Sequence, residues 1–262
     1  MIRALSTAAT GLEAQQAKIA NIANDLANVN TDGYKRTNTE FHELMYETLK
    51  EPGGSLGSNS QSPVGVQVGM GVRVGAAHKN FEQGPAKTTG NPFDLMIEGP
   101  GFFPVITPQG EQAYTRAGAF HLDSQGILQL SGGHKLAPQV TIPNGALNIS
   151  VSHGGEFSAS LPGSGPGTAV LGQLQLVNFQ NPEGLIAMGE GLYKTSPASG
   201  GPIQAVPGEN GMGFVQQGEL EGSNTNVTNS MVDMIQTQRG YEMGTKVMGV
   251  VDQMLGATVN IK

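Results

Sequence analysis

The chain has 262 residues, a formal net charge of −7, no cysteine, and charged side chains at only 13% of its positions. The negative balance argues against nucleic-acid binding, which requires a basic face, and the lack of cysteine excludes disulfides and thiolate metal sites. Glycine accounts for 39 of the 262 residues, about 15%, against a usual share of about 7%. This high glycine content favours β-structure with many tight turns. No apolar run reaches the length of a membrane span, and polar residues interrupt the N-terminal region where a cleavable signal would be apolar.

Apolar residues recur every seven positions in the first thirty residues and again near the C-terminus. This spacing predicts two long amphipathic helices with a coiled-coil-like seam. The run 28–33 favours a turn after the first helix, and 223–226 offers several N-caps for the second. The pair either closes one globular domain or packs against copies of itself in other subunits. The predicted helix interface consists of Leu5, Leu12, Ile19, Ile22, Leu26, Val227, Met231, Met234, Tyr241, Met248 and Leu255.

The segment that follows the first helix is less regular. Up to Lys50, periodicity does not distinguish helix from extended chain. Beyond it lies a low-complexity stretch that predicts a loop or linker. Its residues are Pro52, Gly53, Gly54, Ser55, Leu56, Gly57, Ser58, Asn59, Ser60, Gln61 and Ser62.

Residues from about 64 to 222 read as all-β. Large apolar residues alternate with small or polar ones from Val64 to Val74, which predicts one strand with a single apolar face. Short strands with turn punctuation follow, including a hairpin turn at 123–126. The predicted fold is therefore mixed α and β and discontinuous: the terminal helices pair as an antiparallel coiled-coil-like domain, and a mainly antiparallel all-β region is inserted between them. The predicted parts are 1–32 with 226–262, a connecting domain at 33–82 with 206–225 and an extended loop at 46–63, and a β-domain at 83–205.

Motifs for chemistry are nearly absent. The five histidines stand singly, without the spacing of a metal site, and no phosphate-binding or dinucleotide-binding glycine motif is complete. Only Gly53 to Gly57 fits the GxSxG nucleophile elbow, but its surroundings do not form the strand-turn-helix that this elbow requires. A secreted β-rich hydrolase with Ser55 as nucleophile is the alternative from this match. No cofactor, metal, nucleic acid or small-molecule substrate is predicted.

Four segments resemble those of the bacterial flagellar rod and hook proteins, and together they span nearly the whole chain. They are Ala27 to Lys35, Ile97 to Phe103, Tyr114 to Gly118, and Gly222 to Glu242. Four motifs in the right order are more specific than any one alone. The signature positions are Asn28, Asn30, Thr31, Gly33, Tyr34, Gln238, Arg239 and Tyr241.

The resemblance implies a structural subunit without enzymatic activity. Length and the segment 46–63 resemble the distal rod members, with another rod, hook or junction member as the alternative. The implied function is a helical homopolymer that forms a rigid hollow drive shaft and part of an export channel. Implied partners are the proximal rod and hook proteins, the L- and P-ring proteins and the type III export apparatus. The implied location is the basal body, from the periplasm to the outer membrane, reached without a cleavable signal. The 52–62 loop would contact a neighbouring subunit and prevent sliding.

Four residues depart from expectation. Gly240, Gly244 and Thr225 stand where the family usually has Ala, Asn and Val. A glycine inside a helix costs about 1 kcal/mol relative to alanine. The second helix should therefore depend more on assembly. Pro104 lies in a predicted strand, which should be an edge strand there because proline lacks an amide hydrogen.

Overall fold

The computed structural model describes residues 2–51, 55–57, 60–61, 64–143, 145–160 and 168–259. The chain forms two compact units and passes between them four times. The first, here the helical unit, comprises Met1–Leu26, Thr37–His78 and Val227–Lys262; the second, the β unit, comprises Ala27–Arg36 and Lys79–Asn226. The finer three-part division predicted from the sequence stays a prediction.

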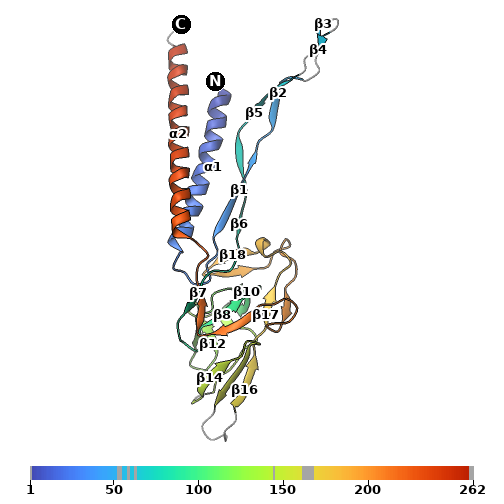
Figure 1. Cartoon of the computed structure of the whole chain (residues 1–262), viewed down its shortest axis with the longest axis vertical. Coiled ribbons are helices and arrows are strands. Elements are labelled where there is room, and N and C mark those ends of the chain that lie inside the picture. The colour runs from blue at the N-terminus through green and yellow to red at the C-terminus, as the bar shows by residue number, and fades with distance from the viewer. Residues whose placement is uncertain are drawn as a thin grey trace. The chain divides into compact units, whose positions relative to one another are not determined.

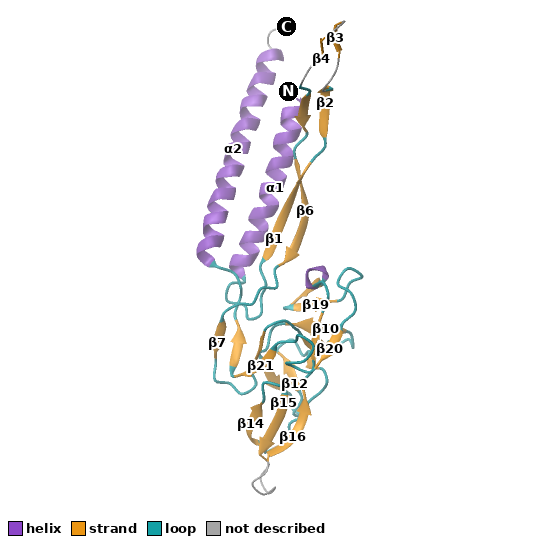
Figure 2. Cartoon of the chain, turned by 45° about the vertical axis from the view of Figure 1, so that its right-hand side comes forward, coloured by secondary structure: helices purple, strands orange, loops and turns teal. Residues whose placement is uncertain are grey.

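Two helices dominate the helical unit. They are α1 (Ile2–Ala27) and α2 (Val227–Val259), which run antiparallel with both chain ends at the same end of the pair (Figures 1 and 2). α1 ends where the turn-forming run begins, and the amide of Thr31 donates to the carbonyl of Asn28 at 3.1 Å. Terminal helices with a largely antiparallel β region between them confirm the predicted fold class. Their packing as a coiled coil stays a prediction.

A long two-stranded ribbon completes the helical unit, so the segment whose periodicity was ambiguous is extended. Its strands pair as β1 with β6 and β2 with β5, with β3 and β4 beyond them. The bounds are β1 (Thr37–Glu43), β2 (Tyr46–Lys50), β3 (Ser55–Gly57), β4 (Ser60–Gln61), β5 (Val66–Gly69) and β6 (Val72–Lys79).

The prediction of one continuous strand from Val64 to Val74 is wrong, because the strand breaks at Met70 and Gly71. Gly71 has φ +113°, a conformation that side chains disfavour, and a Cβ on Gly71 would overlap Thr10 Oγ1 of α1. Close approach of the ribbon to α1 therefore interrupts the strand between β5 and β6.

Most of the predicted 52–62 loop, with all its side chains including Ser55, lies outside the described residues.

The β unit is built around a seven-stranded antiparallel sheet in the order β11-β12-β13-β9-β10-β19-β18, with a three-stranded sheet β14-β15-β16 and the pairs β17-β20, β21-β8 and β22-β7. The predicted hairpin at 123–126 joins β11 to β12, and the amide of Gly126 donates to the carbonyl of Asp123 at 2.8 Å. The bounds are β7 (Ala86–Thr88), β8 (Leu95–Glu98), β9 (Phe103–Ile106), β10 (Gln112–Thr115), β11 (Phe120–Leu122), β12 (Leu128–Leu130), β13 (Lys135–Leu136), β14 (Leu147–Val151), β15 (Glu156–Ser160), β16 (Thr168–Gln173), β17 (Leu176–Asn178), the 3₁₀ turn η1 (Pro182–Gly184), β18 (Ile186–Gly189), β19 (Leu192–Lys194), β20 (Ile203–Ala205), β21 (Phe214–Gln217) and β22 (Glu219–Glu221).

Two apolar clusters form because neighbouring residues point to opposite faces of a strand. Phe103 belongs to the larger cluster with Leu95 and Phe120, whereas the preceding Phe102 belongs to an aromatic cluster with Tyr114 and Tyr193. The rings meet edge to face, with centroids 5.4 Å apart for Phe103 and Phe120, an arrangement that adds to area burial. The Phe102-Phe103 pair thus supplies one ring to each cluster.

The prediction that Pro104 lies in an edge strand is wrong. β9 is an interior strand between β13 and β10. Pro104 pairs with Tyr114 on one side, and on the other its carbonyl accepts from the amide of Ala137, just past the end of β13. Because β13 ends at Leu136, the amide hydrogen that Pro104 lacks would point to a place where the hydrogen-bond ladder between β9 and β13 has already ended.

Neither described helix is long and apolar enough to cross a membrane.

Candidate subunit interface

α1 packs on two sides within the helical unit. Toward the ribbon, Asn21 donates to Thr39 Oγ1 at 2.7 Å, and both carboxylate oxygens of Asp25 accept from the amide of Thr37 at 3.1 Å. Near its start, Arg3 forms an exposed ion pair with Glu47 at 2.7 Å. The predicted interface residues of this helix are all half-buried: Leu5, Leu12, Ile19, Ile22 and Leu26.

α2 faces α1 with a mixture of large and very small residues. Thr237 is its most buried side chain, at 3% exposed. A Cβ on Gly244 would lie 2.7 Å from Leu12 Cδ2, and one on Gly240 would lie 3.6 Å from Gln15 Cδ. The covered face consists of Ser230, Met234, Thr237, Gly240, Gly244, Met248, Val251 and Leu255. Of the predicted interface residues, Met234, Met248 and Leu255 lie on it, whereas Val227, Met231 and Tyr241 are more exposed.

A second apolar stripe runs along α2 on a different face. We name Val232, Met243, Val247, Val250 and Met254 the outer stripe; each side chain is about half exposed, from 48% for Val232 to 61% for Met243. At 3.6 residues per turn these positions fall within an arc of roughly 60°. Val232 stands apart from the other four, because the exposed Gln236 falls between it and Met243 in the same arc. Soluble proteins expose single apolar residues routinely, but a row such as Met243, Val247, Val250 and Met254 marks an interaction surface.

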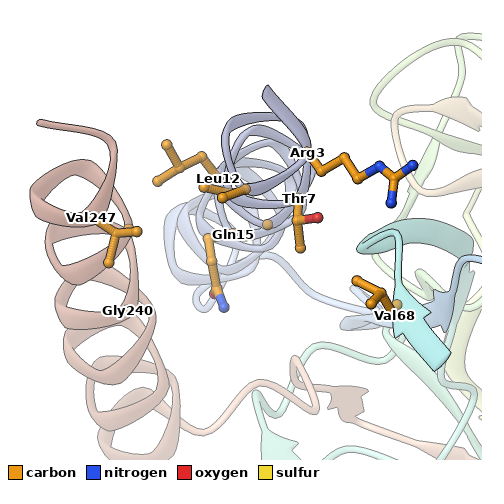
Figure 3. A pocket seen from close by; sticks show the side chains of 12 residues that line it. Arg3, Thr7, Leu12, Gln15, Val68, Gly240 and Val247 are labelled. Carbon is orange, nitrogen blue, oxygen red and sulfur yellow. The ribbon is translucent and has the colours of Figure 1, made fainter. Parts of the chain in front are cut away.

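A groove of about 710 Å³ lies within the helical unit. Its walls are mostly small or apolar residues, and in Figure 3 Leu12 of α1 and Val247 of α2 point toward one another across it. Ala4, Ala8, Gly11, Gly240 and Gly244 leave the groove room, and Val68 of β5 closes its far side. A groove of this size and character can take the apolar side of another helix.

The ribbon exposes further apolar side chains. Met45 is 83% exposed, and Tyr46, Leu49, Val66 and Met70 are about half exposed. An isolated two-stranded ribbon is marginally stable in water. Its exposed residues therefore extend the surface that another molecule could cover.

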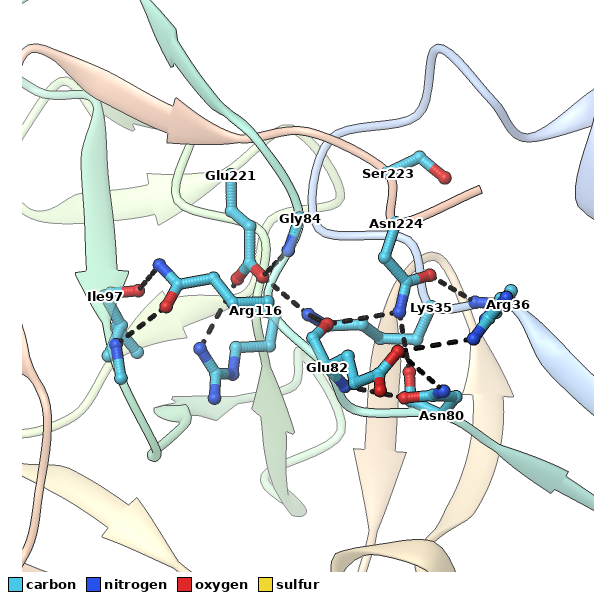
Figure 4. A network of polar contacts seen from close by, with 12 residues as sticks. Lys35, Arg36, Asn80, Glu82, Gly84, Ile97, Arg116, Glu221, Ser223 and Asn224 are labelled. Carbon is cyan, nitrogen blue, oxygen red and sulfur yellow. Dashed lines mark hydrogen bonds and ion pairs between the residues drawn. The ribbon is translucent and has the colours of Figure 1, made fainter. Parts of the chain in front are cut away.

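The β unit contains a buried polar cluster, which we name the junction cluster: Lys35, Arg116, Glu221 and Asn224 (Figure 4). Glu221 Oε1 accepts from Lys35 Nζ at 2.5 Å and from the amide of Gly84 at 2.9 Å, and its Oε2 accepts from Arg116 at 3.4 Å. Asn224 accepts from the amide of Arg36 at 2.7 Å and donates to the carbonyl of Asn80 at 2.9 Å. These contacts tie together three chain segments that each begin or end where the chain passes between the units.

Burial governs the electrostatics of this cluster. The side chains of Lys35 and Glu221 are fully buried, and that of Arg116 is 4% exposed. Desolvation lowers the pKa of Lys35, and the Glu221 carboxylate opposes that shift. Desolvation likewise lowers the pKa of Arg116 and raises the pKa of Tyr193 to about 12.

Glycines bring the sequence motifs into contact around the cluster. Gly33 has φ +72°, its amide donates to the carbonyl of Glu221 at 2.7 Å, and a Cβ on it would lie 2.6 Å from the amide nitrogen of Ala117. Gly118 approaches the carbonyl of Leu95 so closely that any side chain would overlap it. The segments around Gly33, Gly118 and Leu95 are therefore held together by contacts that only glycine permits.

Three family models match the chain. The model described as "Flagella basal body rod protein" matches residues 5–35, the "Flagellar hook protein FlgE/F/G D1 domain" matches 96–159, and the "Flagellar basal body rod FlgEFG protein C-terminal" matches 216–261. The flagellar basal-body rod protein FlgG of Caulobacter vibrioides is 41% identical over 262 residues, covering all of both chains. FlgG of Borreliella burgdorferi is 41% identical over 264 residues, covering 100% of this chain and 99% of the other.

The chain belongs to the FlgG family of flagellar basal-body rod proteins.

Family membership makes this chain a structural subunit of the distal rod in the flagellar basal body, which assembles with other rod and hook components. FlgG relatives are structural proteins, and the chain is therefore not an enzyme. The alternative of a hydrolase with Ser55 as nucleophile is wrong. Among the described residues, no group of three or more His, Asp or Glu side chains could hold a metal ion.

The FlgG signature residues separate into two places. Those near the N-terminus lie in the β unit, where Tyr34 accepts from Lys79 at 3.2 Å and Thr31 donates to Asn28 at 3.2 Å. Those near the C-terminus lie on exposed parts of α2. The first set is Asn28, Asn30, Thr31, Gly33 and Tyr34, and the second is Gln238, Arg239 and Tyr241.

Sequence reasoning missed the junction cluster. Lys35 and Arg116 both stand inside motifs that carried the family resemblance, and a charged residue within an otherwise apolar or glycine-rich motif was the available signal. Glu221 and Asn224 carried no such signal, because acidic and amide residues before a helix are most often caps. Only the fold brings them to the two cations.

Proposed function

We propose that copies of this chain assemble through the helical unit into a straight, hollow, helical tube that transmits torque from the motor to the hook. The proposal rests on membership in the FlgG family, whose members form the rod. The observation that carries it is the outer stripe, five half-exposed apolar side chains on a helix whose other face already packs in its own unit.

Energetics favour covering this stripe. Burying one Leu-, Val- or Met-sized side chain contributes roughly 1.5–3 kcal/mol, whereas an exposed ion pair contributes about 0–1 kcal/mol. Five such residues repeated around a tube outweigh any surface ion pair, even after the entropy of ordering side chains is subtracted. Methionine suits such a seam because it adapts to slightly different neighbours.

The stripe borders the groove in the same unit, and the two surfaces share Val247. If the stripe of one copy enters the groove of the next, the contact is heterologous, and repeating it produces a helical filament or a ring and not an isolated dimer. The small residues of the groove and the larger residues of the stripe are complementary in size.

From Gln238 to Gln253 a third face of α2 is polar, and we assign this part of the helix to the channel. Its residues are exposed and lie within an arc of roughly 120° on the helix. A channel that carries unfolded chains needs a surface to which apolar segments do not adhere. The face consists of Gln238, Glu242, Thr245, Lys246, Asp252 and Gln253.

The proposed export route and location rest on membership in the FlgG family. The proposed route is the flagellar type III apparatus, without a cleavable signal, and the proposed location runs from the periplasm to the outer membrane. The proposed neighbours are the proximal rod and hook proteins and the L- and P-rings. The 52–62 loop is the proposed contact that prevents adjacent subunits from sliding.

The test replaces one stripe residue by an acid and compares it with a matched change on the polar face. Met243→Glu should abolish tubes seen by electron microscopy and abolish swimming of a host that depends on this subunit. Thr245→Glu, two positions away on the same helix, should retain both. Normal tubes from Met243→Glu, or equal loss in both variants, would overturn the assignment of the stripe.

A further inference from the structure

The junction cluster carries one cation more than its anions. Lys35 and Arg116 share one buried carboxylate, Glu221, and all three side chains are at least nine-tenths buried. The carboxylate of Glu82, which also acts on Lys35, is mostly exposed and pairs with Arg36. Glu221 accepts its two shorter hydrogen bonds from Lys35 and from the amide of Gly84. Arg116 holds the longer contact, 3.4 Å, and its Nε has no hydrogen-bond partner among the described residues. Buried charges are ordinarily paired and buried donors bonded, so this guanidinium is under-compensated.

Arg116 opens onto a cavity of about 270 Å³ within the β unit, which we name the Arg116 cavity. Phe81 and Phe102 form apolar walls, and the Phe102 ring lies 5.3 Å from the guanidinium carbon. Gly99 and Gly101 line it with backbone alone, at φ +106° and +139°. Asn178 contributes a neutral amide. The cavity therefore combines apolar walls with one strong cationic donor.

Size and charge limit what fits. The volume lies below the roughly 300–1,000 Å³ typical of small-molecule sites, so one side chain is a better match than a metabolite. A guanidinium binds carboxylates most strongly among side-chain acceptors. The chain itself supplies the partner chemistry, since it carries 21 acidic residues and a net charge of −7.

We propose that the Arg116 cavity receives the carboxylate of an exposed Asp or Glu side chain from a second copy of this chain. The inference rests on the proposed function, because only a polymer brings a second copy to this surface. The incoming carboxylate pairs with the Arg116 guanidinium at the cavity and offsets the surplus charge of the cluster. Assembly is then coupled to the cluster that ties the connecting segments together.

The first experiment occupies the cavity with a carboxylate of the chain itself. Asn178→Asp preserves the side-chain oxygen that accepts from the amide of Phe179 at 2.8 Å, so the monomer should stay folded. The variant should lower the rate of tube formation by about ten-fold or more, since like charges at an interface repel. Gln180→Glu is the matched control: it introduces the same charge two residues away, at an exposed position that does not line the cavity. Wild-type rates from Asn178→Asp, or equal slowing in both variants, would overturn the proposal.

The second experiment uses the dilute full-length monomer and is independent of assembly. The side-chain Nε–H resonance of Arg116 should shift saturably with N-acetylglutamate, and should not shift with N-acetylglutamine or in Asn178→Asp. No saturable shift overturns the proposal even if tubes form normally. A shift with chloride alone assigns the cavity to a free anion and also overturns it. Failure of the wild-type chain to form tubes, with the resonance shift intact, would instead count against the proposed function.

Discussion

Glu221 joins three chain segments through one carboxylate. Lys35, Gly84 and Arg116 donate to it from segments far apart in the sequence, and it is fully buried. Truncating one member of a buried ionic group is costly mainly because it leaves the others unpaired. The loss in free energy of unfolding caused by each substitution should therefore depend on the net charge left in the buried cluster.

We expect Glu221→Gln to lower the free energy of unfolding by about 3–5 kcal/mol, because two buried cations would have no buried anion to pair with. Lys35→Met should cost less, because Glu221 keeps Arg116 and the remaining pair is neutral. The double variant should be more stable than Glu221→Gln alone. Urea unfolding of the full chain at neutral pH measures all three. Additive losses in the double variant would show that the two side chains do not interact.

Tyr193 makes stability depend on alkaline pH. Its side chain is 4% exposed, and desolvation raises its pKa from 10.0 to about 12. Between these values the unfolded chain releases the phenol proton and the folded chain keeps it, so the folded state is destabilised as pH rises. The stabilisation is complete below pH 10 and lost progressively up to about pH 12, on the order of 2–3 kcal/mol at about 1.4 kcal/mol per pH unit.

Tyr193→Phe removes that titration, and its free energy of unfolding should fall less steeply than that of the wild type above pH 10. The measurement is urea unfolding at a series of pH values from neutral to alkaline, with the difference between variant and wild type plotted against pH. A constant difference across the series would contradict the assignment.

At the scale of elements, the glycines of α2 have opposite effects on the free helix and on its packing. Each costs about 1 kcal/mol of helix stability relative to alanine. Gly240 and Gly244, however, face Gln15 and Leu12 of α1 and line the groove. The departures from the family residues thus weaken the isolated helix and shape a surface for a neighbour.

The loop between β2 and β5 is the element proposed to resist sliding. Deleting residues 52–62 should give tubes that still assemble, since the outer stripe and groove remain, but that bend more easily. Electron microscopy measures the effect as a shorter persistence length. Replacing the same residues by an equally long Gly-Ser segment separates loop length from loop sequence. Tubes of unchanged stiffness after deletion would rule out the loop as the strut.

At the scale of the molecule, the two units differ in how they are stabilised. The β unit buries large apolar clusters with many side chains below 2% exposure. The helical unit leaves the outer stripe and much of the ribbon half exposed. Local stability follows buried apolar contact, so the units should open independently and at different cost.

Hydrogen exchange on dilute monomer should therefore be fast in α1 and α2 and slow in β9, β10 and β12. The β unit is the internal control within the same sample. In assembled tubes, protection of the helices should rise, because neighbours cover the outer stripe. Strong protection of both helices in the monomer would mean that the helical unit is stable without partners.

Local periodicity determined much of the fold. A seven-residue apolar step specified both terminal helices, turn residues set the end of α1 near Ala27, and the 123–126 turn specified a hairpin, because each signal is contained in neighbouring residues. Four ordered motifs likewise sufficed for the family. The interrupted strand at Gly71 and the interior position of Pro104 were predicted wrongly, because each depends on an element distant in sequence.

The sequence by itself thus determined two long helices, a β-rich middle and a structural subunit of the flagellar rod. Only the tertiary structure decided which face of α2 packs on its own unit and which stays open, and that Lys35, Arg116 and Glu221 share one buried site. The physical reason is range: helix and turn preferences act over a few residues, whereas burial and charge pairing depend on which distant segments the fold brings within a few ångströms.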